Sequence, residues 1–276
     1  MAVVAALRKG IRLLFVGMLM GFCDLVPGVS GSSVAYLCGV YENLVEAINK
    51  PRVHLSFLIP LLLGILFALA SFAIPLNYVM QNLVARSLLL SFFIGLSAAC
   101  AVRAFIESKG AFVFLLFGAF CSAMLNMVSS LAFFESGALP LVFAGLLSGM
   151  ALLFPAVSGA QILYLLGLYP FVIENLAHFV ATGNISSFYV LFSLGSGVLG
   201  GIFIASKILR LLFNKFSKQL HGFFSGFIVL ALPRLWPFEG ILPSGASYWS
   251  AVALMGLGLM LGFTLSYTTR SSGVSK

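Results

Sequence analysis

Charged residues are scarce in this 276-residue sequence, where they make up only 8%. A soluble domain needs about a quarter of its residues charged to cover its surface. Hydrophobic residues instead reach 61%, and the mean hydropathy is +1.14. This composition predicts a polytopic membrane protein and excludes a soluble nucleic-acid-binding domain, a disordered chain and a disulfide scaffold. The net charge of +8 therefore reports on orientation in a membrane rather than on a DNA partner.

Motifs for catalysis and metal binding are also missing. The sequence contains no HExxH, Walker loop or GxSxG pattern, and its three histidines are far apart. The four cysteines form no CxxC pair and have no histidine at a metal-ligand spacing, which predicts buried apolar thiols. We therefore expect neither an enzyme nor a bound metal or cofactor.

Two segments of the chain share a motif at a constant spacing of 128 residues. Residues 17–41 match residues 145–169 at 12 of 25 positions, whereas this composition would give roughly two by chance. The shared core is Pro27-Gly28-Val29-Ser30-Gly31 in the first copy and Pro155-Ala156-Val157-Ser158-Gly159 in the second. Such self-similarity indicates a duplicated structural unit.

The match continues more weakly at a spacing of 131 residues. It pairs Gly64 with Gly195, and Arg103 with Arg234. The chain is therefore predicted to consist of two homologous halves, residues 1–138 and residues 139–276, which together form one membrane domain.

Six other apolar runs have the length of a membrane span, about 20 residues. They lie near residues 55–76, 86–104, 111–134, 187–208, 219–235 and 246–268. The repeat segments 11–48 and 139–177 are too long for one span, and each is broken near its middle by Pro, Gly and Ser. Each could be a re-entrant hairpin that returns to its own side or a broken helix that crosses.

Basic residues favour the re-entrant hairpins. If both segments are hairpins, 13 of the 15 Lys and Arg residues share one face, whereas two single crossings give a split of 10 to 5. The positive-inside rule selects the first arrangement, with both termini cytoplasmic. Three spans separate the hairpins, so the second enters from the opposite face. The predicted fold is an all-α polytopic membrane protein of two inverted repeats, each with a re-entrant helical hairpin and about three transmembrane helices, which is typical of secondary transporters.

The hairpin tips are the first candidate binding site. A half-helix that begins at a Ser inside the membrane directs free backbone N–H groups and a positive dipole end toward the protein centre, which suits an anion. The candidate residues are Pro27, Gly28, Ser30, Gly31, Ser32 and Ser33 in the first tip, and Pro155, Ser158, Gly159 and Gln161 in the second. The alternative is that these small residues only permit close helix packing.

Asp24 is the one acidic residue that we place deep in the membrane, where a carboxylate is costly and is usually functional. Its counterpart in the second half is Leu152. Beside an anion site, Asp24 would repel the substrate unless it bound a proton or a cation. It is therefore a candidate for H⁺ or Na⁺ coupling, and the alternative is a carboxylate that caps the backbone of the turn.

Three arginines are candidates for contacting a lipid phosphate. Arg103 and Arg234 end equivalent spans at opposite faces, and Arg86 lies on the outer face that otherwise has few bases. A guanidinium can bind a phosphate through two parallel hydrogen bonds. The alternative is that these side chains only extend to the membrane surface.

The motif that joins Gly17, Gly21, Asp24, the first tip and Gly39-Val40-Tyr41-Glu42, with its second copy, resembles the polyprenyl-phosphate transporter family of bacteria and archaea. The resemblance covers essentially the whole chain. It implies a flippase of the plasma membrane, surrounded by membrane lipids. Such a flippase returns undecaprenyl phosphate, or a related polyprenyl phosphate, from the outer to the cytoplasmic leaflet for reuse in envelope synthesis. The alternatives are an ion-coupled carrier or channel for a small soluble anion, and a membrane scaffold without transport activity.

Overall fold

The computed structural model describes residues 2–26, 29–127, 138–155, 157–236 and 246–271. Every regular element in these ranges is a helix. In chain order the helices are α1 (Ala2–Asp24), α2 (Gly31–Leu37), α3 (Tyr41–Asn49), α4 (Leu55–Gln81), α5 (Leu83–Ser108), α6 (Phe112–Met127), α7 (Ala138–Leu152), α8 (Gly159–Leu165), α9 (Tyr169–Thr182), α10 (Ile185–Ala231), the 3-10 helix η1 (Leu232–Leu235) and α11 (Ala246–Ser271).

Within the described residues, four helices are long and apolar enough to cross a membrane. They are α4, α5, α10 and α11. Helices α6 and α7 are apolar but shorter. The prediction of an all-helical, multi-pass membrane protein is confirmed at this level. Part of the predicted span 111–134 lies outside the described residues.

Helix α10 contains both of the predicted spans 187–208 and 219–235. Its 47 residues are interrupted at Phe216, whose φ of −134° and ψ of 37° are not helical. No Gly or Pro lies between Arg210 and Gln219, so no local sequence signal marked a full break there. The two predicted spans are therefore joined by a kink instead of a loop.

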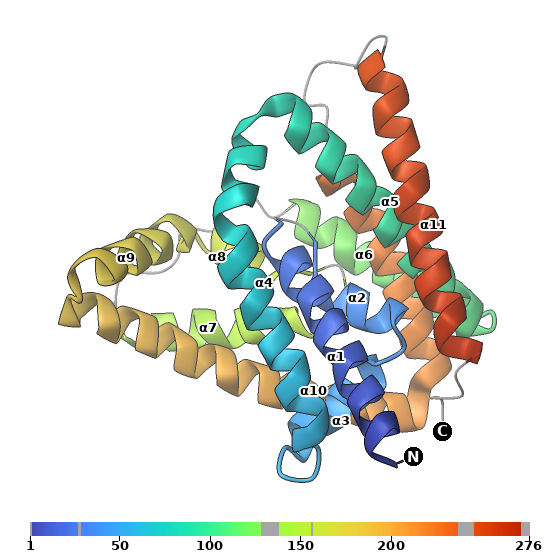
Figure 1. Ribbon diagram of the computed structural model, residues 1–276, viewed down its shortest axis with the longest axis horizontal. Helices are drawn as coiled ribbons and strands as arrows, with labels where there is room; N and C mark the ends of the chain where they lie inside the picture. The colour runs from blue at the N-terminus through green and yellow to red at the C-terminus, as the bar shows by residue number, and fades with distance from the viewer. Residues whose placement is uncertain (1, 27–28, 128–137, 156, 237–245, 272–276) are drawn as a thin grey trace.

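Figure 1 shows how these helices are arranged. Helices α7, α8 and α9 and the first part of α10 extend to the left, while α5, α6, α11 and the last part of α10 lie to the right. Helices α1 to α4 lie between them, and the beginning of α1 and the end of α11 both point toward the lower side of the view.

Glycines bring the backbones of two helix pairs into direct contact. In the α1–α4 pair, a Cβ at Gly17 would overlap the carbonyl of Leu61, and a Cβ at Gly64 would overlap that of Leu14. In the α7–α10 pair, Gly197 meets the carbonyl of Val142. Close packing of small residues is a common way to join helices in membranes, where the hydrophobic effect contributes little.

The structure gives the role of Gly64 to Gly197 in the second half, although the sequence match had paired Gly64 with Gly195. No atom lies within 4 Å of a Cβ built on Gly195, whereas Gly197 meets the backbone of Val142 and Leu146. The two halves therefore differ by two further residues before this helix pair, an offset that the weak sequence match did not detect.

Two other seams join the first half of the chain to the second. Gly118 of α6 meets the carbonyl of Phe223 in α10, and Gly258 of α11 meets that of Phe92 in α5. Phe92 and Phe223 are the positions that the 131-residue offset pairs. The α6–α10 and α5–α11 seams therefore use corresponding positions with the roles of the two halves exchanged.

Substituting valine for Gly64 is expected to reduce the folded fraction sharply, because the new methyl groups would overlap backbone that cannot move cheaply. Overpacking of this kind costs about 1–3 kcal/mol or more. The measurement is the monodisperse fraction in detergent together with the thermal midpoint. The control is Gly195→Val, which has open space and should behave like the wild type; equal loss in both variants would contradict this packing.

Candidate functional site

The first hairpin is formed by α1 and α2, which run antiparallel to each other. The Gly31 amide, at the start of α2, donates to Asp24 Oδ1 at the end of α1 over 2.7 Å. Arg12 Nη2, three turns earlier in α1, donates to the Cys38 carbonyl just after α2 over 3.3 Å. The chain therefore turns back between Asp24 and Gly31, and the whole of α2 is buried.

Charged side chains complement both ends of α2. The Asp24 carboxylate lies at the N-terminal end, where the helix dipole is positive, while Arg12 and Arg103 donate to the Cys38 and Leu37 carbonyls at the negative end. Asp24 thus makes the capping contact that the sequence left as one of two alternatives. The same carboxylate occupies the Gly31 N–H that was predicted to face an anion.

The other predicted residues of the first tip are buried and partly bonded to one another. Ser30, the N-cap residue of α2, has its Oγ 2.7 Å from Ser32 Oγ. The Ser33 carbonyl accepts a weak bond of 3.8 Å from Cys100 Sγ of α5. Pro27 and Gly28 lie outside the described residues. This tip is a packed turn whose polar groups largely satisfy each other.

The second hairpin, formed by α7 and α8, has a different tip. Ser148 of α7 donates to the Gly159 carbonyl over 2.8 Å, and Ser158 is the N-cap residue of α8. Leu152 occupies the place of Asp24, so this helix start has no carboxylate cap from that position. The Gln161 Oε1 atom is buried without a hydrogen-bond partner among the described residues. An unpaired buried amide is costly, which makes it a candidate for contacting a polar guest.

The two hairpins also differ in how deeply they are buried. Pro155 and Ser158 are buried in the second tip, but of α8 itself only Gly159 and Leu163 are. Tyr164 is 64% exposed, whereas its counterpart Tyr36 in α2 is 5% exposed. The second hairpin therefore lies more loosely against the protein than the first.

The hairpins meet where the second tip contacts α3. The Tyr41 hydroxyl donates to the Leu153 carbonyl over 2.5 Å. The rings of Phe154 and Tyr41 both lie edge-on to Phe224 of α10, at centroid distances of 6.2 and 6.0 Å. The beginning of the second turn is thus anchored to the end of the first hairpin.

The three candidate arginines are not brought together. Arg86 lies in the first turn of α5 and Arg103 near its end, so about 25 Å of helix separates them. Arg103 contacts the C-terminal end of α2, roughly 10 Å from the tip at its other end. The backbone of Arg234 is part of η1, and its side chain lies outside what the structure describes.

Arg103 belongs to a buried polar network that sequence analysis missed. Its Nε donates to Glu107 Oε1 over 3.0 Å, and its guanidinium lies 5.5 Å from the centre of the Tyr36 ring. Glu107 Oε2 accepts from the Tyr36 hydroxyl over 2.7 Å and lies 3.1 Å from His221 Nε2. The spacing of four residues between Arg103 and Glu107 was a readable signal for an ion pair on one helix, but nothing local pointed to His221.

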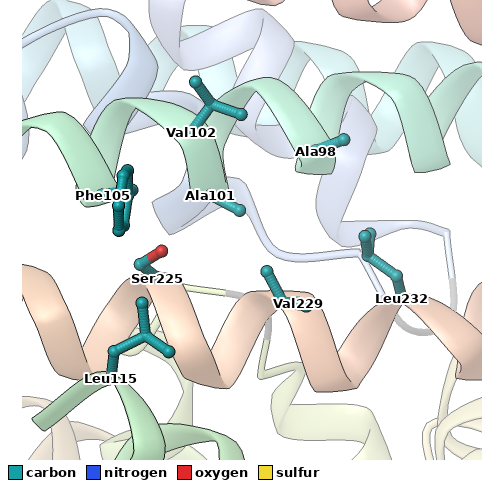
Figure 2. A pocket seen from close by; sticks show the side chains of 8 residues that line it. All are labelled: Ala98, Ala101, Val102, Phe105, Leu115, Ser225, Val229 and Leu232. Atoms are coloured by element: carbon teal, nitrogen blue, oxygen red, sulfur yellow. The ribbon is translucent and has the colours of Figure 1, made fainter. Parts of the chain in front are cut away.

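A mostly apolar pocket of about 280 Å³ lies next to this network, between α5, α6 and α10 (Figure 2). Ala98 and Val229 face it from α5 and α10, and Ser225 is its polar residue. The full lining is Ala98, Ala101, Val102, Phe105, Leu115, Ser225, Val229 and Leu232. Ala98 and Val229 are separated by the 131-residue offset, so the pocket lies between corresponding positions of the two halves.

Comparison with known proteins decides the family. A family model described as undecaprenyl phosphate translocase-like matches residues 20–250. The chain belongs to this family. The resemblance noted in the sequence is thereby confirmed, and the family is one of transporters rather than enzymes.

Two curated relatives extend over most of the chain. A protein of Vibrio cholerae named polyprenyl-phosphate transporter is 27% identical over 251 residues, which cover 82% of this chain and 77% of the relative. A Staphylococcus aureus protein of the same name is 25% identical over 274 residues, which cover 91% and 93%. No solved structure matches the chain.

Proposed function

We propose that this protein carries a polyprenyl phosphate, such as undecaprenyl phosphate, across the plasma membrane of a bacterial or archaeal cell. The observation that carries the proposal is the family match over residues 20–250, together with two relatives named polyprenyl-phosphate transporter. The proposed direction is from the outer to the cytoplasmic leaflet, so that the lipid is reused in envelope synthesis. The phosphate crosses through the protein, while the isoprenoid tail stays among the membrane lipids.

The proposed architecture is two inverted repeats, residues 1–138 and 139–276, each with a re-entrant hairpin and with both termini cytoplasmic. The antiparallel contacts between Asp24 and Gly31 and between Arg12 and Cys38 support the first hairpin. The exchanged glycine seams support a two-fold relation, since such an axis makes two corresponding contacts from one.

In the proposed route the phosphate first meets the second tip, where Ser158, Gly159 and Gln161 offer polar groups without a competing carboxylate. It leaves near Arg103, and Arg86 and Arg234 collect it at the outer face. The first tip, with Ser30, Gly31, Ser32 and Ser33, becomes available only when Asp24 moves away from the Gly31 amide. The larger exposure of the second hairpin supports this order of contacts.

Inward movement of an anion needs an energy source. A cytoplasm that is negative by 100 mV opposes each negative charge by about 2.3 kcal/mol. A cation that travels with the phosphate offsets this cost, which is why we expect coupling to H⁺ or Na⁺. Asp24 stays a candidate for binding that ion, and its contact with the Gly31 amide is also what a capping residue would make.

The purified protein is expected to bind polyprenyl phosphate at least about tenfold more tightly than the corresponding alcohol, because one buried charge-assisted hydrogen bond contributes about 1.5–3 kcal/mol. Quenching of intrinsic Trp and Tyr fluorescence by each lipid in nanodiscs measures the two affinities. Equal affinities would remove the phosphate from recognition and overturn the proposal. Liposome uptake of a small anion without any polyprenyl lipid would favour the soluble-anion carrier.

A further inference from the structure

Glu107 and His221 form a direct contact between two helices that are far apart in the sequence. Glu107 is near the end of α5, and its Oε2 atom lies 3.1 Å from Nε2 of His221 in α10. The side chain of His221 is 8% exposed and that of Glu107 is 23% exposed. The contact is therefore largely screened from water but still reachable from one side.

Hydrogen-bond accounting shows that this contact holds a proton. His221 Nδ1 lies 2.6 Å from the Ser217 carbonyl, which can only accept, so Nδ1 carries a hydrogen. A hydrogen must also lie between His221 Nε2 and Glu107 Oε2, since two bare acceptors would repel each other. Glu107 already accepts from Tyr36 and Arg103, which favours the carboxylate. The arrangement is an imidazolium paired with a carboxylate.

Loss of that proton would break the contact. If His221 releases the Nε2 hydrogen to water, its lone pair faces the Glu107 carboxylate and the two helices lose their bridge. Tyr36 ties the same carboxylate to α2, and Arg103 ties it to the end of α2. Proton occupancy is thus linked to the relative position of α5, α10 and the first hairpin.

Few other ionisable groups lie on the elements around the pair. They are Arg12 of α1, Tyr36 of α2, Tyr41 of α3, Cys100 and Arg103 of α5 and Cys121 of α6, while Lys215 and Lys218 of α10 and Tyr267 of α11 are exposed. The buried cation Arg103 is already paired with Glu107. The pair is therefore the group in this cluster that can gain or lose a proton through its own hydrogen bond.

We propose that Glu107 and His221 form the binding site of a proton that crosses the membrane together with each phosphate. The inference rests on the proposed function, because it supplies the cation that offsets the charge of the lipid. The proton binds when Glu107 and a neutral His221 form the imidazolium–carboxylate pair, and it leaves from Nε2 when the pair separates. No covalent bond is made or broken apart from this N–H bond.

The test uses the full chain in proteoliposomes, with the potential clamped and a fluorescent polyprenyl phosphate distributed between the leaflets. With one proton carried per phosphate, a gradient of one pH unit should change the leaflet ratio of the wild type about tenfold. The ratio should lose this response in Glu107→Gln and in His221→Gln. The controls Glu46→Gln and His178→Gln change an exposed acid and an exposed histidine and should respond like the wild type.

Each other result decides against some part of the idea. If the two variants keep the tenfold response, the proton travels on the phosphate itself and the assignment to Glu107 and His221 is overturned. A wild-type ratio that ignores the gradient has the same consequence while leaving the proposed transport intact. Absence of any leaflet exchange by the wild type would instead overturn the proposed function.

A second measurement applies if the variants do not fold. In wild-type proteoliposomes, a trapped pH-sensitive dye should report acidification on entry of a polyprenyl phosphodiester, whose headgroup gains no proton near neutral pH. Entry of the diester without acidification would overturn the proton site.

Discussion

Replacement of Arg103 by alanine is expected to abolish transport and to lower the stability of the protein by about 3–5 kcal/mol, the usual cost of removing one partner of a buried ion pair. Arg103 is 13% exposed and donates to both the Leu37 carbonyl and Glu107. Its loss leaves the Glu107 carboxylate short of a donor and the end of α2 without a cation. Thermal unfolding in detergent and leaflet exchange in proteoliposomes measure the two effects.

Two further variants separate the structural role of Arg103 from its role in transport. Arg103→Lys should restore only part of the stability, since one ammonium cannot reproduce the planar fork that reaches both partners. The double variant Arg103→Met/Glu107→Met should regain much of the stability, because both charges are then gone, but it should not transport. Wild-type transport by the double variant would show that the network serves the fold alone.

Substitution of Asp24 by leucine, the residue found at the corresponding position 152, is expected to reduce transport at least tenfold and stability by about 1–3 kcal/mol. The buried Gly31 amide would lose its acceptor. Asp24→Asn keeps an oxygen at the same place, and asparagine caps helices about as well as aspartate does. We expect this variant to fold normally and to retain transport, as judged by the same two assays.

The exposed acid Glu42 provides the control, because Glu42→Gln changes a charge on α3 without a buried partner amide. A well-folded Asp24→Asn protein that does not transport would contradict a purely capping role. That result would assign the coupling ion to the carboxylate of Asp24 instead.

Much of the fold was readable because membrane helices carry strong local signals. The apolar runs located α4, α5 and α11, and the Ser residues at 30 and 158 correctly marked the starts of the two short helices. Serine at a helix start acts through its immediate neighbours, so a pattern of a few residues is enough to find it.

The polar network was not readable because its members meet only in three dimensions. His221 reaches Glu107 only because α10 bends at Phe216 and then packs against α5. No Gly or Pro announces that bend. The contact of Asp24 with Gly31 likewise depends on how the turn between them closes, which the residue types alone left open between capping and ion binding.

The glycine seams have a consequence for motion. Where backbone meets backbone, as between α1 and α4 or between α7 and α10, two helices can slide only if many van der Waals contacts break at once. Each pair should therefore move as one stiff lever. Rotation is then left to the joints between levers, and the non-helical residue Phe216 is where the long α10 can serve as a hinge.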